Sequence, residues 1–259
     1  MKIAVCVKQV PDSETRINLA APAAVLDQSG FTRILNPYDA YGVEEAVKIK
    51  EAGGEVEVTA ITIGPETVKE TIKKDCLAVG CDKAVMITDP VLDGADEATI
   101  ATVLVAALKR DEFDLILFGN KAIDDDSGQV GILVAEKLGL PHISAITHLE
   151  IGEGSLTAHR EIEGGKEVVK ASLPAVLTCQ KGLNEPRLPS LPNIMKAGMK
   201  PMETVTCADL GLEVPANLVE IKLYSPPPAR AECKLVEAEE PAQAAKELAR
   251  LLNEEAKVI

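Results

Sequence analysis

The sequence predicts an α/β fold in which a twisted parallel sheet carries helices on both faces. Through residue 139, short runs rich in β-branched and aliphatic residues alternate with longer helical runs, which is the pattern of right-handed βαβ units. Gly53, Gly80 and Gly139 stand where the left-handed cap of a helix is expected. Because 46% of the 259 residues are hydrophobic, the chain can bury the core of one large α/β domain.

The first half of the chain is expected to hold four strands, each followed by a helix. No internal repeat of fixed period appears beyond this βα alternation. The expected strands are residues 2–10, 55–64, 83–89 and 114–120, and the expected helices are residues 38–54, 65–81, 95–112 and 127–139.

Beyond Pro141 the pattern changes to an antiparallel insertion. Strand-like segments within residues 144–180 are separated by Gly-Glu-Gly and Glu-Gly-Gly turns, which are typical of hairpins. Residues 181–201 hold four prolines and one short helical patch at Ile194 and Met195. We therefore expect a hairpin insertion that feeds a last buried strand, followed by a surface loop with a helical turn.

Residues 225–259 are expected to form an extended arm that ends in a helix. Three prolines at 226–228 favour a polyproline path. The apolar stripe of the final helix can pack on another chain or fold back on the domain that precedes it, and the sequence pattern leaves both possibilities open. The expected organisation is an α/β domain at 1–224 and an arm at 225–259. The apolar stripe of the final helix consists of Ala244, Leu248, Leu251 and Leu252.

Composition excludes several classes of protein. Aromatic residues make up 2% of the chain and Trp is absent, so the stacking platforms of single-stranded nucleic-acid binders are missing. The formal net charge of -14 repels phosphate backbones and anionic lipid and favours a basic partner. Residues 1–12 lack the apolar run that is typical of a signal peptide, and no stretch approaches ~20 uninterrupted apolar residues, so neither a signal peptide nor a membrane span is expected. We expect a cytoplasmic protein that binds no nucleic acid and is not embedded in a membrane.

Cysteine and histidine patterns indicate no catalytic or metal site. The six cysteines lie far apart without a Cys-x-x-Cys pair, so they are expected to be small core residues in a reducing compartment. The three histidines, at 142, 148 and 159, fall in or beside the insertion without metal spacing or an evident nucleophile. We predict no catalytic residue and no metal ligand.

Three loops are expected to meet at the carboxyl edge of the parallel sheet, where folds of this kind bind ligands. They are residues 8–12, 63–66 and 119–128. Lys8, in the first loop, either reaches a phosphate or is a solvated side chain. Neither G-x-G-x-x-G nor the P-loop motif occurs in the chain. The site is therefore expected to hold a nucleotide without either common phosphate-binding fingerprint.

The third loop, Gly-Asn-Lys-Ala-Ile-Asp-Asp-Asp-Ser-Gly-Gln-Val-Gly at 119–131, is the best candidate for phosphate binding. A helix that begins near Ser127 would leave several backbone N–H groups free to hold an anion. The expected donors are Gly128, Gln129 and Val130.

The same loop carries three consecutive aspartates. Asp126 is the expected N-cap of the helix, while Asp124 and Asp125 can accept hydrogen bonds from ribose hydroxyls. Alternatively, all three acids decorate an exposed helix start, where each stabilises the helix by about 0.3–1 kcal/mol.

Six segments of the chain resemble the β subunit of electron-transfer flavoproteins, and the likeness covers nearly the whole chain. The segments are VCVKQVPD at 5–12, NPYDAYGVEEAVKIKE at 36–51, IGPE at 63–66, GNKAIDDDSGQVG at 119–131, AHREIEGGKEVVKASLPAVLTC at 158–179 and LNEPRLPSLPNIMKA at 183–197. The fifth matches the family signature at Ala158, Arg160, Glu163, Gly164, Gly165, Glu167, Val169, Pro174 and Thr178.

The resemblance implies an adenine nucleotide α-hydrolase-like fold and an obligate heterodimer. In that family the α subunit carries the redox-active FAD, while the β subunit binds a second adenine nucleotide and completes the FAD environment. Tyr38 matches an aromatic residue that approaches the flavin ring. The implied cofactor-binding residues are Cys6, Asn36, Pro37, Tyr38, Asp39, Ile63, Ala122, Asp124, Asp126, Ser127, Gly128, Gln129 and Val130.

The resemblance also implies a recognition loop at about 183–200. Leu191 matches the hydrophobic anchor that enters a pocket of an acyl-CoA dehydrogenase, and the C-terminal arm is expected to pack on the partner subunit. The implied function is to carry electrons from acyl-CoA dehydrogenase-type flavoenzymes to a quinone oxidoreductase or other acceptor, without substrate turnover. The implied partner-binding residues are Leu191, Pro192, Ile194 and Met195.

The family offers two interpretations of the nucleotide site. Simple carriers bind structural AMP, whereas electron-bifurcating members oxidise NADH and bind a second FAD. Asp125 follows the AMP type, but Gly128, Gln129 and Val130 resemble the bifurcating type. Because Val130 lacks the hydroxyl that AMP-type members often supply, Ser127 is the expected substitute. We favour AMP and simple carriage; a stand-alone nucleotide sensor of the universal-stress type is a third alternative.

Overall fold

The computed structural model describes residues 1–20, 25–214 and 232–259. The chain divides into two compact units. One comprises Met1–Asn18 and Leu26–Ile221, and the other comprises Leu19–Val25 and Lys222–Ile259. The expected boundary at residues 224 and 225, and the three prolines at 226–228, lie outside the described residues.

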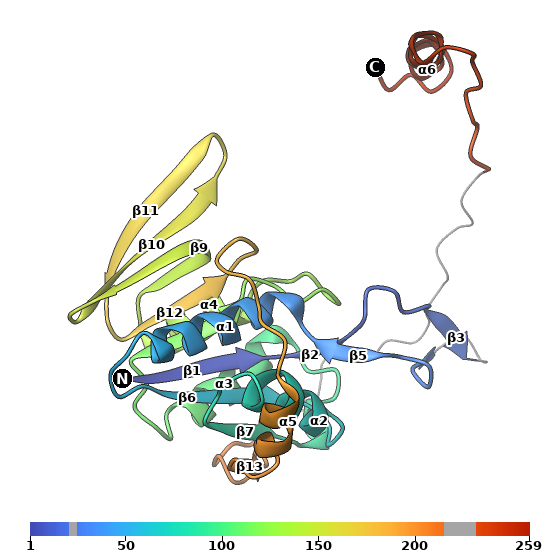
Figure 1. Ribbon diagram of the computed structural model, residues 1–259. Coiled ribbons are helices and arrows are strands. Elements are labelled where there is room, and N and C mark those ends of the chain that lie inside the picture. Colours follow the sequence, from blue (N-terminus) through green and yellow to red (C-terminus); the bar gives the residue numbers. More distant parts are fainter. Residues whose placement is uncertain (21–24, 215–231) are drawn as a thin grey trace. The chain divides into compact units, whose positions relative to one another are not determined.

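The first unit is built on a nine-stranded sheet (Figure 1). Seven neighbouring strands of this sheet, from β9 to β13, are parallel, and the expected parallel sheet is confirmed. Across the sheet the order is β11-β10-β9-β12-β8-β1-β6-β7-β13. The parallel strands are β1 (Lys2–Val7), β6 (Glu57–Ile63), β7 (Lys83–Ile87), β8 (Leu115–Gly119), β9 (His142–Gly152), β12 (Ala175–Cys179) and β13 (Met202–Val205).

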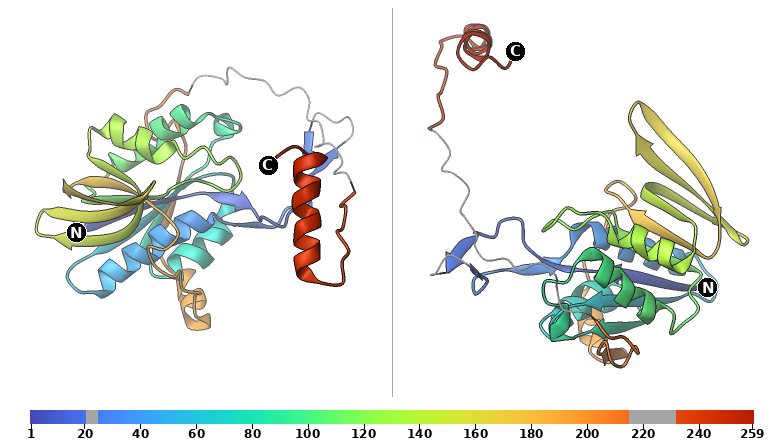
Figure 2. Two further views of the ribbon diagram at one scale, coloured as in Figure 1. Left: turned by 90° about the horizontal axis from the view of Figure 1, so that it is seen from above. Right: turned by 180° about the vertical axis from the view of Figure 1, so that it is seen from behind.

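Helices cover both faces of this sheet, as Figure 2 shows. Strand β1 explains why two cores form, because alternate residues point to opposite faces. Ile3 and Val5 pack in the core beneath α1 and α2, while Ala4 and Cys6 pack in the core beneath α3 and α4. The helices are α1 (Pro37–Glu51), α2 (Val68–Ile72), which continues as a π-helical turn (Lys73–Leu77), α3 (Glu97–Leu108) and α4 (Val130–Leu138), with a 3₁₀ turn at Pro90–Leu92.

The expected antiparallel insertion is confirmed. Strand β9 (His142–Gly152) runs parallel to β12 and antiparallel to β10 (Ser155–Ile162), which pairs in turn with β11 (Gly165–Ser172). Gly154 and Gly164 have φ values of 68° and 78° at the two hairpin turns, which glycine adopts without steric cost. The last strand of the insertion, β12, is buried throughout, as expected.

Several short strands were not expected from the sequence. The predicted strand 2–10 is interrupted at Lys8, because the N–H of Lys8 donates to the side chain of Asp39 instead of to a neighbouring strand. The residues after it form β2 (Gln9–Pro11), which pairs with β5 (Arg33–Leu35). The remaining additions are β13 and a two-stranded sheet of β3 (Asn18–Ala20) and β4 (Val25–Asp27).

The surface loop after β12 contains the expected helical turn, α5 (Leu191–Ala197). The side chain of Ser190 caps it by accepting a hydrogen bond from the N–H of Asn193. Ala197, at the other end, is buried in the core beneath α1 and α2. The loop is therefore attached to the domain at the end of this helix.

The second unit contains the amphipathic helix α6 (Pro241–Glu254). Ala244, Leu251 and Leu252 are partly buried, whereas Leu248 is exposed. On the polar face, Arg250 pairs with Glu247 and Glu254. Among the described residues, no helix is long and apolar enough to cross a membrane.

The central strand β8 offers a test of the core. Leu117 is fully buried there, so Leu117→Ala is expected to lower the free energy of unfolding by about 2–5 kcal/mol. Urea titration followed by circular dichroism measures this change. The matched control, Leu235→Ala, truncates an exposed leucine and should change the value by less than ~0.5 kcal/mol. Equal losses in the two variants would contradict the core described here.

Candidate functional site

A cavity of about 770 Å³ opens at the carboxyl ends of the parallel strands. This volume is within the usual range for small-molecule sites. The three expected loops all contribute to its wall, so their predicted convergence is confirmed. A fourth loop, after β7, was missed by sequence reasoning, although it too follows a parallel strand. Its lining residues include Thr88, Asp89, Leu92, Asp93, Gly94, Ala95 and Glu97.

Most of the predicted cofactor-binding residues line this cavity, and four do not. Asp125 and Lys8 also line it. The four outside the lining are Pro37, Tyr38, Asp124 and Asp126. The nine in the lining are Cys6, Asn36, Asp39, Ile63, Ala122, Ser127, Gly128, Gln129 and Val130.

The turn before α4 presents backbone donors to the cavity. Gly128, Gln129, Val130 and Gly131 all line it, and within the described part of the chain their N–H groups have no protein acceptor. Gly128 has a φ of 62°, and a Cβ atom there would lie 3.3 Å from the backbone oxygen of Asn120. Glycine therefore suits both the backbone conformation and the close packing of this turn.

The prediction that Asp126 caps α4 is wrong. The helix begins at Val130, three residues later than expected, and Gln129 is its N-cap without a side-chain capping bond. Asp126 instead adopts a φ of 57° in the preceding turn and donates its N–H to the oxygen of Ala122. The turn delays the helix, because a left-handed residue cannot lie within a right-handed helix.

The three aspartates of the loop are paired with two lysines. Lys8 Nζ lies 2.9 Å from a carboxylate oxygen of Asp124 and 2.7 Å from one of Asp125. Lys121 Nζ lies 2.8 Å from Asp126. The acids therefore do not lie at a helix start, since α4 begins beyond them, and each has a cationic partner. Their contact with ribose hydroxyls stays a prediction.

These pairs shift the protonation equilibria in the expected directions. Burial alone would lower the pKa of Lys8, but hydrogen bonds to Asp125 and Asp124 raise it above the ordinary value. Burial alone would raise the pKa of Asp125, but the bonds from Lys8 and Ser127 lower it. Both groups are thus held in their charged forms beside the cavity.

Asn36 links helix α1 to the same loop. Its side chain is buried; Nδ2 donates to the oxygen of Lys121 at 2.9 Å, and Oδ1 accepts from the N–H of Ile123 at 3.3 Å. Both bonds fix backbone that precedes the aspartates. Asn36 therefore shapes the cavity wall as well as lining it.

Asp39 joins the ends of two central strands. One carboxylate oxygen accepts from the N–H of Lys8 at 2.7 Å, after β1, and the other accepts from Gly119 at 3.0 Å, at the end of β8. Burial raises the pKa of Asp39 to about 7, against the effect of these hydrogen bonds. A Cβ atom on Gly119 would lie 2.8 Å from the backbone nitrogen of Asp39, so only glycine allows this close approach.

Tyr38 lies beside the loop rather than in the cavity lining. Lys121 Nζ is 5.9 Å from the centroid of its ring, which is within the range of a cation–π contact. Sequence reasoning found Tyr38 by resemblance but missed Lys121, whose only local signal is a basic residue next to an acidic run.

Among the described residues, no cluster of histidine, cysteine, aspartate or glutamate side chains could hold a metal ion. Burial raises the pKa of the Cys6 thiol, so it faces the cavity as a neutral group. His148 and His159 pair across strands of the insertion with ring centroids 4.6 Å apart.

The predicted partner-binding residues lie on α5, at the surface. Leu191 and Met195 are 76% and 77% exposed, Ile194 is 40% exposed, and Pro192 is also exposed. Sequence reasoning missed two neighbours, Leu188 and Met199, which are more exposed still. Their signal in the sequence was only a large apolar residue in a proline-rich loop.

The raised pKa of Asp39 predicts a pH-dependent stability. The folded chain holds this proton more tightly than the unfolded chain, whose carboxyl has a pKa of about 4. The contribution to stability is therefore complete below pH 4 and is lost as the pH rises to about 7. The free energy of unfolding of the wild type should fall, relative to that of Asp39→Asn, by on the order of a few kcal/mol across this window. Denaturant titrations of both proteins at several pH values measure this change. If the difference between their free energies of unfolding stays constant with pH, the raised pKa of Asp39 is contradicted.

Comparison with known proteins places the chain in a family. A family model described as "Electron transfer flavoprotein domain" matches residues 24–210. The electron transfer flavoprotein subunit beta of Bacillus subtilis (strain 168) is 44% identical over 263 residues, which cover both chains fully. The Homo sapiens protein of the same description is 34% identical over 253 residues, 97% of this chain and 99% of its own.

A further relative is described as part of a larger assembly. Caffeyl-CoA reductase-Etf complex subunit CarD of Acetobacterium woodii is 38% identical over 213 residues, 82% of this chain and 80% of its own. The family model covers well over half of the chain, and the Bacillus subtilis and Homo sapiens proteins match it nearly end to end. The chain therefore belongs to the electron transfer flavoprotein family, among its β subunits.

Proposed function

We propose that this β subunit binds structural AMP in the cavity at the carboxyl edge of its sheet. As a member of this family it serves electron transfer together with an α subunit. In the proposal the two form an obligate heterodimer, the α subunit holds most of the FAD, and Tyr38 faces the flavin. The complex carries electrons from an acyl-CoA dehydrogenase-type flavoenzyme to a quinone oxidoreductase or other acceptor in the cytoplasm.

One observation carries the nucleotide proposal: the four consecutive residues from Gly128 to Gly131 line the cavity, and among the described residues their N–H groups have no protein acceptor. Such a group of donors at the start of a helix suits a phosphate, which also gains from the helix dipole. The paired lysines limit the repulsion that three nearby aspartates would otherwise exert on a phosphate.

The other walls suit the rest of an adenylate. Asp125 and Ser127 line the cavity close to the free N–H groups, and their oxygens can accept hydrogen bonds from ribose hydroxyls. Ile63 and Cys6 offer an apolar wall for the base. AMP at this site would order the loop and brace the β subunit, with no redox role.

A second candidate is a bifurcating complex with a second FAD at this site. The cavity continues past the phosphate turn over Leu92, Ile100 and Leu104, so it offers apolar surface beyond the residues proposed for AMP. The sequence of the turn is mixed. Asp125 resembles the AMP type, whereas Gly128, Gln129 and Val130 resemble the bifurcating type. Family membership argues against the third candidate, the stand-alone sensor.

The cofactor content of the purified heterodimer tests this proposal. We expect one FAD and one AMP per heterodimer, released by denaturation and quantified by chromatography with absorbance detection. Two FAD and no AMP would establish the bifurcating alternative. A heterodimer with one FAD, no AMP and no second FAD would contradict the proposed role of the cavity.

Gly128→Ala tests the phosphate turn directly. A side chain at a φ of 62° and 3.3 Å from the Asn120 oxygen should displace the N–H groups, so we expect AMP affinity to fall by about ten-fold, a loss near 1.4 kcal/mol. Isothermal titration calorimetry on the AMP-depleted heterodimer measures it. The matched control is Gly154→Ala, which introduces the same backbone strain at a φ of 68° in a hairpin turn with open space around it. Equal affinity losses in both variants would show that the effect is not local to the turn.

A further inference from the structure

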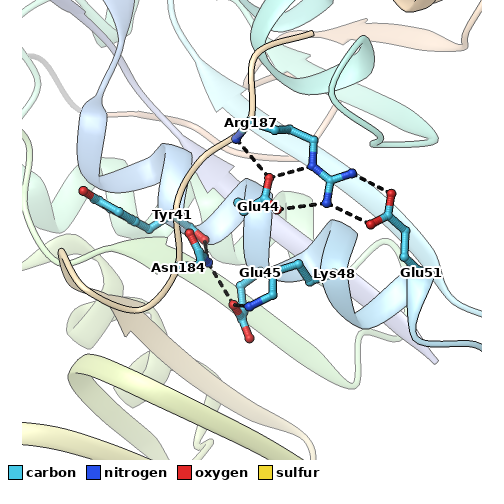
Figure 3. Close-up of polar contacts among 7 residues, drawn as sticks. All are labelled: Tyr41, Glu44, Glu45, Lys48, Glu51, Asn184 and Arg187. Carbon is cyan, nitrogen blue, oxygen red and sulfur yellow. Dashed lines mark hydrogen bonds and ion pairs between the residues drawn. The ribbon is translucent and has the colours of Figure 1, made fainter. Parts of the chain in front are cut away.

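Arg187 ties the loop before α5 to the outer face of α1 through two forked ion pairs (Figure 3). Its Nε and Nη2 donate to the two oxygens of Glu44, each at 2.9 Å. Its Nη1 and Nη2 donate to the two oxygens of Glu51, at 2.6 and 2.8 Å. The backbone N–H of Arg187 also donates to Glu44, at 3.2 Å. The arrangement uses the planar fork of a guanidinium twice.

The ion pairs with Arg187 supply hydrogen-bond donors and a positive charge to the buried carboxylate of Glu44. The side chain of Glu44 is only 6% exposed, and a buried carboxylate without a partner is strongly unfavourable. Hydrogen bonds from Arg187 also lower the pKa of Glu51. Arg187 therefore neutralises an acid of α1 and fixes its own loop in the same set of bonds.

A second attachment lies three residues earlier. The side-chain nitrogen of Asn184 donates to the oxygen of Tyr41 at 3.0 Å and to Glu45 at 2.8 Å. Glu45 also accepts from Lys48, at 3.3 Å. Segment 183–187 is thus bonded to α1 at two points, as Figure 3 shows.

The far end of the same segment is attached too. Ala197 is buried in the core, and Lys200 Nζ donates to the oxygens of Leu77 and Cys81 at 2.8 and 2.6 Å. These carbonyls belong to the end of the π-helical turn and the residues after it. The stretch between Arg187 and Lys200 is therefore held at both ends.

Between the two attachments, five large apolar side chains are exposed, and four of them are more exposed than Ile194. We call these four the apolar surface 188–199: Leu188, Leu191, Met195 and Met199, which are between 76% and 91% exposed. Exposed apolar groups that cluster in this way indicate contact with another protein. Holding them in place before contact lowers the entropy that binding must overcome.

We propose that Arg187 is a positioning residue, which holds the apolar surface 188–199 in its docking geometry through Glu44 and Glu51. The inference rests on the proposed function, in which the electron donor is an acyl-CoA dehydrogenase-type flavoenzyme, and it assigns that enzyme as the occupant of the apolar surface 188–199. The description of the Acetobacterium woodii relative as a subunit of a Caffeyl-CoA reductase-Etf complex supports an enzyme of CoA esters as the partner. Lysine cannot replace Arg187, since an ammonium cannot bond two carboxylates as parallel forks.

The test is electron transfer from a medium-chain acyl-CoA dehydrogenase, reduced by its acyl-CoA substrate, to the purified heterodimer. Arg187→Lys keeps the charge and loses the forks, so we expect the KM for the heterodimer to rise about ten-fold with kcat within about two-fold of the wild type. The matched control is Arg110→Lys, because Arg110 forms one bidentate pair with Glu203 elsewhere on the domain. The control should leave both constants unchanged.

Amide hydrogen exchange of the same heterodimers supplies an independent readout. In Arg187→Lys, exchange at residues 188–199 should become faster while β1, β6 and β8 keep their protection. An unchanged KM, or a loss confined to kcat, would overturn the proposal, as would exchange that rises throughout the domain. If the wild-type heterodimer takes no electrons from the dehydrogenase, the proposed donor class is wrong, and the exchange at 188–199 then decides the positioning role.

Discussion

The carboxylate of Asp39 is the interaction on which the site depends. It is buried in the first turn of α1 and accepts the N–H groups that follow β1 and end β8. Those bonds stop β1 at Val7 and turn the chain away from the sheet, which leaves the strand ends open to the cavity. The close approach requires that Gly119 carry no side chain. A bulkier residue or a different acceptor would move α1 and every loop attached to it.

Helix α1 does more than cover one face of the sheet. Its first turn supplies Asn36 and Asp39 to the cavity, while Glu44 and Glu51 hold the loop that leads to α5. Each of its buried acids has specific hydrogen-bond partners, although for Asp39 these do not offset the effect of burial on the pKa. One rigid helix therefore connects the wall of the proposed nucleotide site with the surface proposed for docking.

The aspartate-rich loop shows how an acidic segment can border an anion site. Lys8 and Lys121 pair with the carboxylates, and the turn at Asp126 carries the chain past them before α4 begins. The N–H groups of the following residues, which line the cavity, are left without a protein acceptor among the described residues. Charge neutralisation by side chains and anion binding by the backbone are thus divided between two parts of one loop.

The sequence alone determined the parallel sheet, the antiparallel insertion, the convergence of loops and the turn that bears the free N–H groups. Periodicity, glycine positions and the succession of strands and helices along the chain are local or nearly local properties. The sequence did not determine which residues pair with the aspartates, where α4 begins or why β1 ends at Val7. Asn36 and Lys121 are 85 residues apart, and Glu44 and Arg187 are 143 apart. Only the tertiary structure could decide these contacts, since a buried polar group finds its partner through packing and no local pattern specifies that partner.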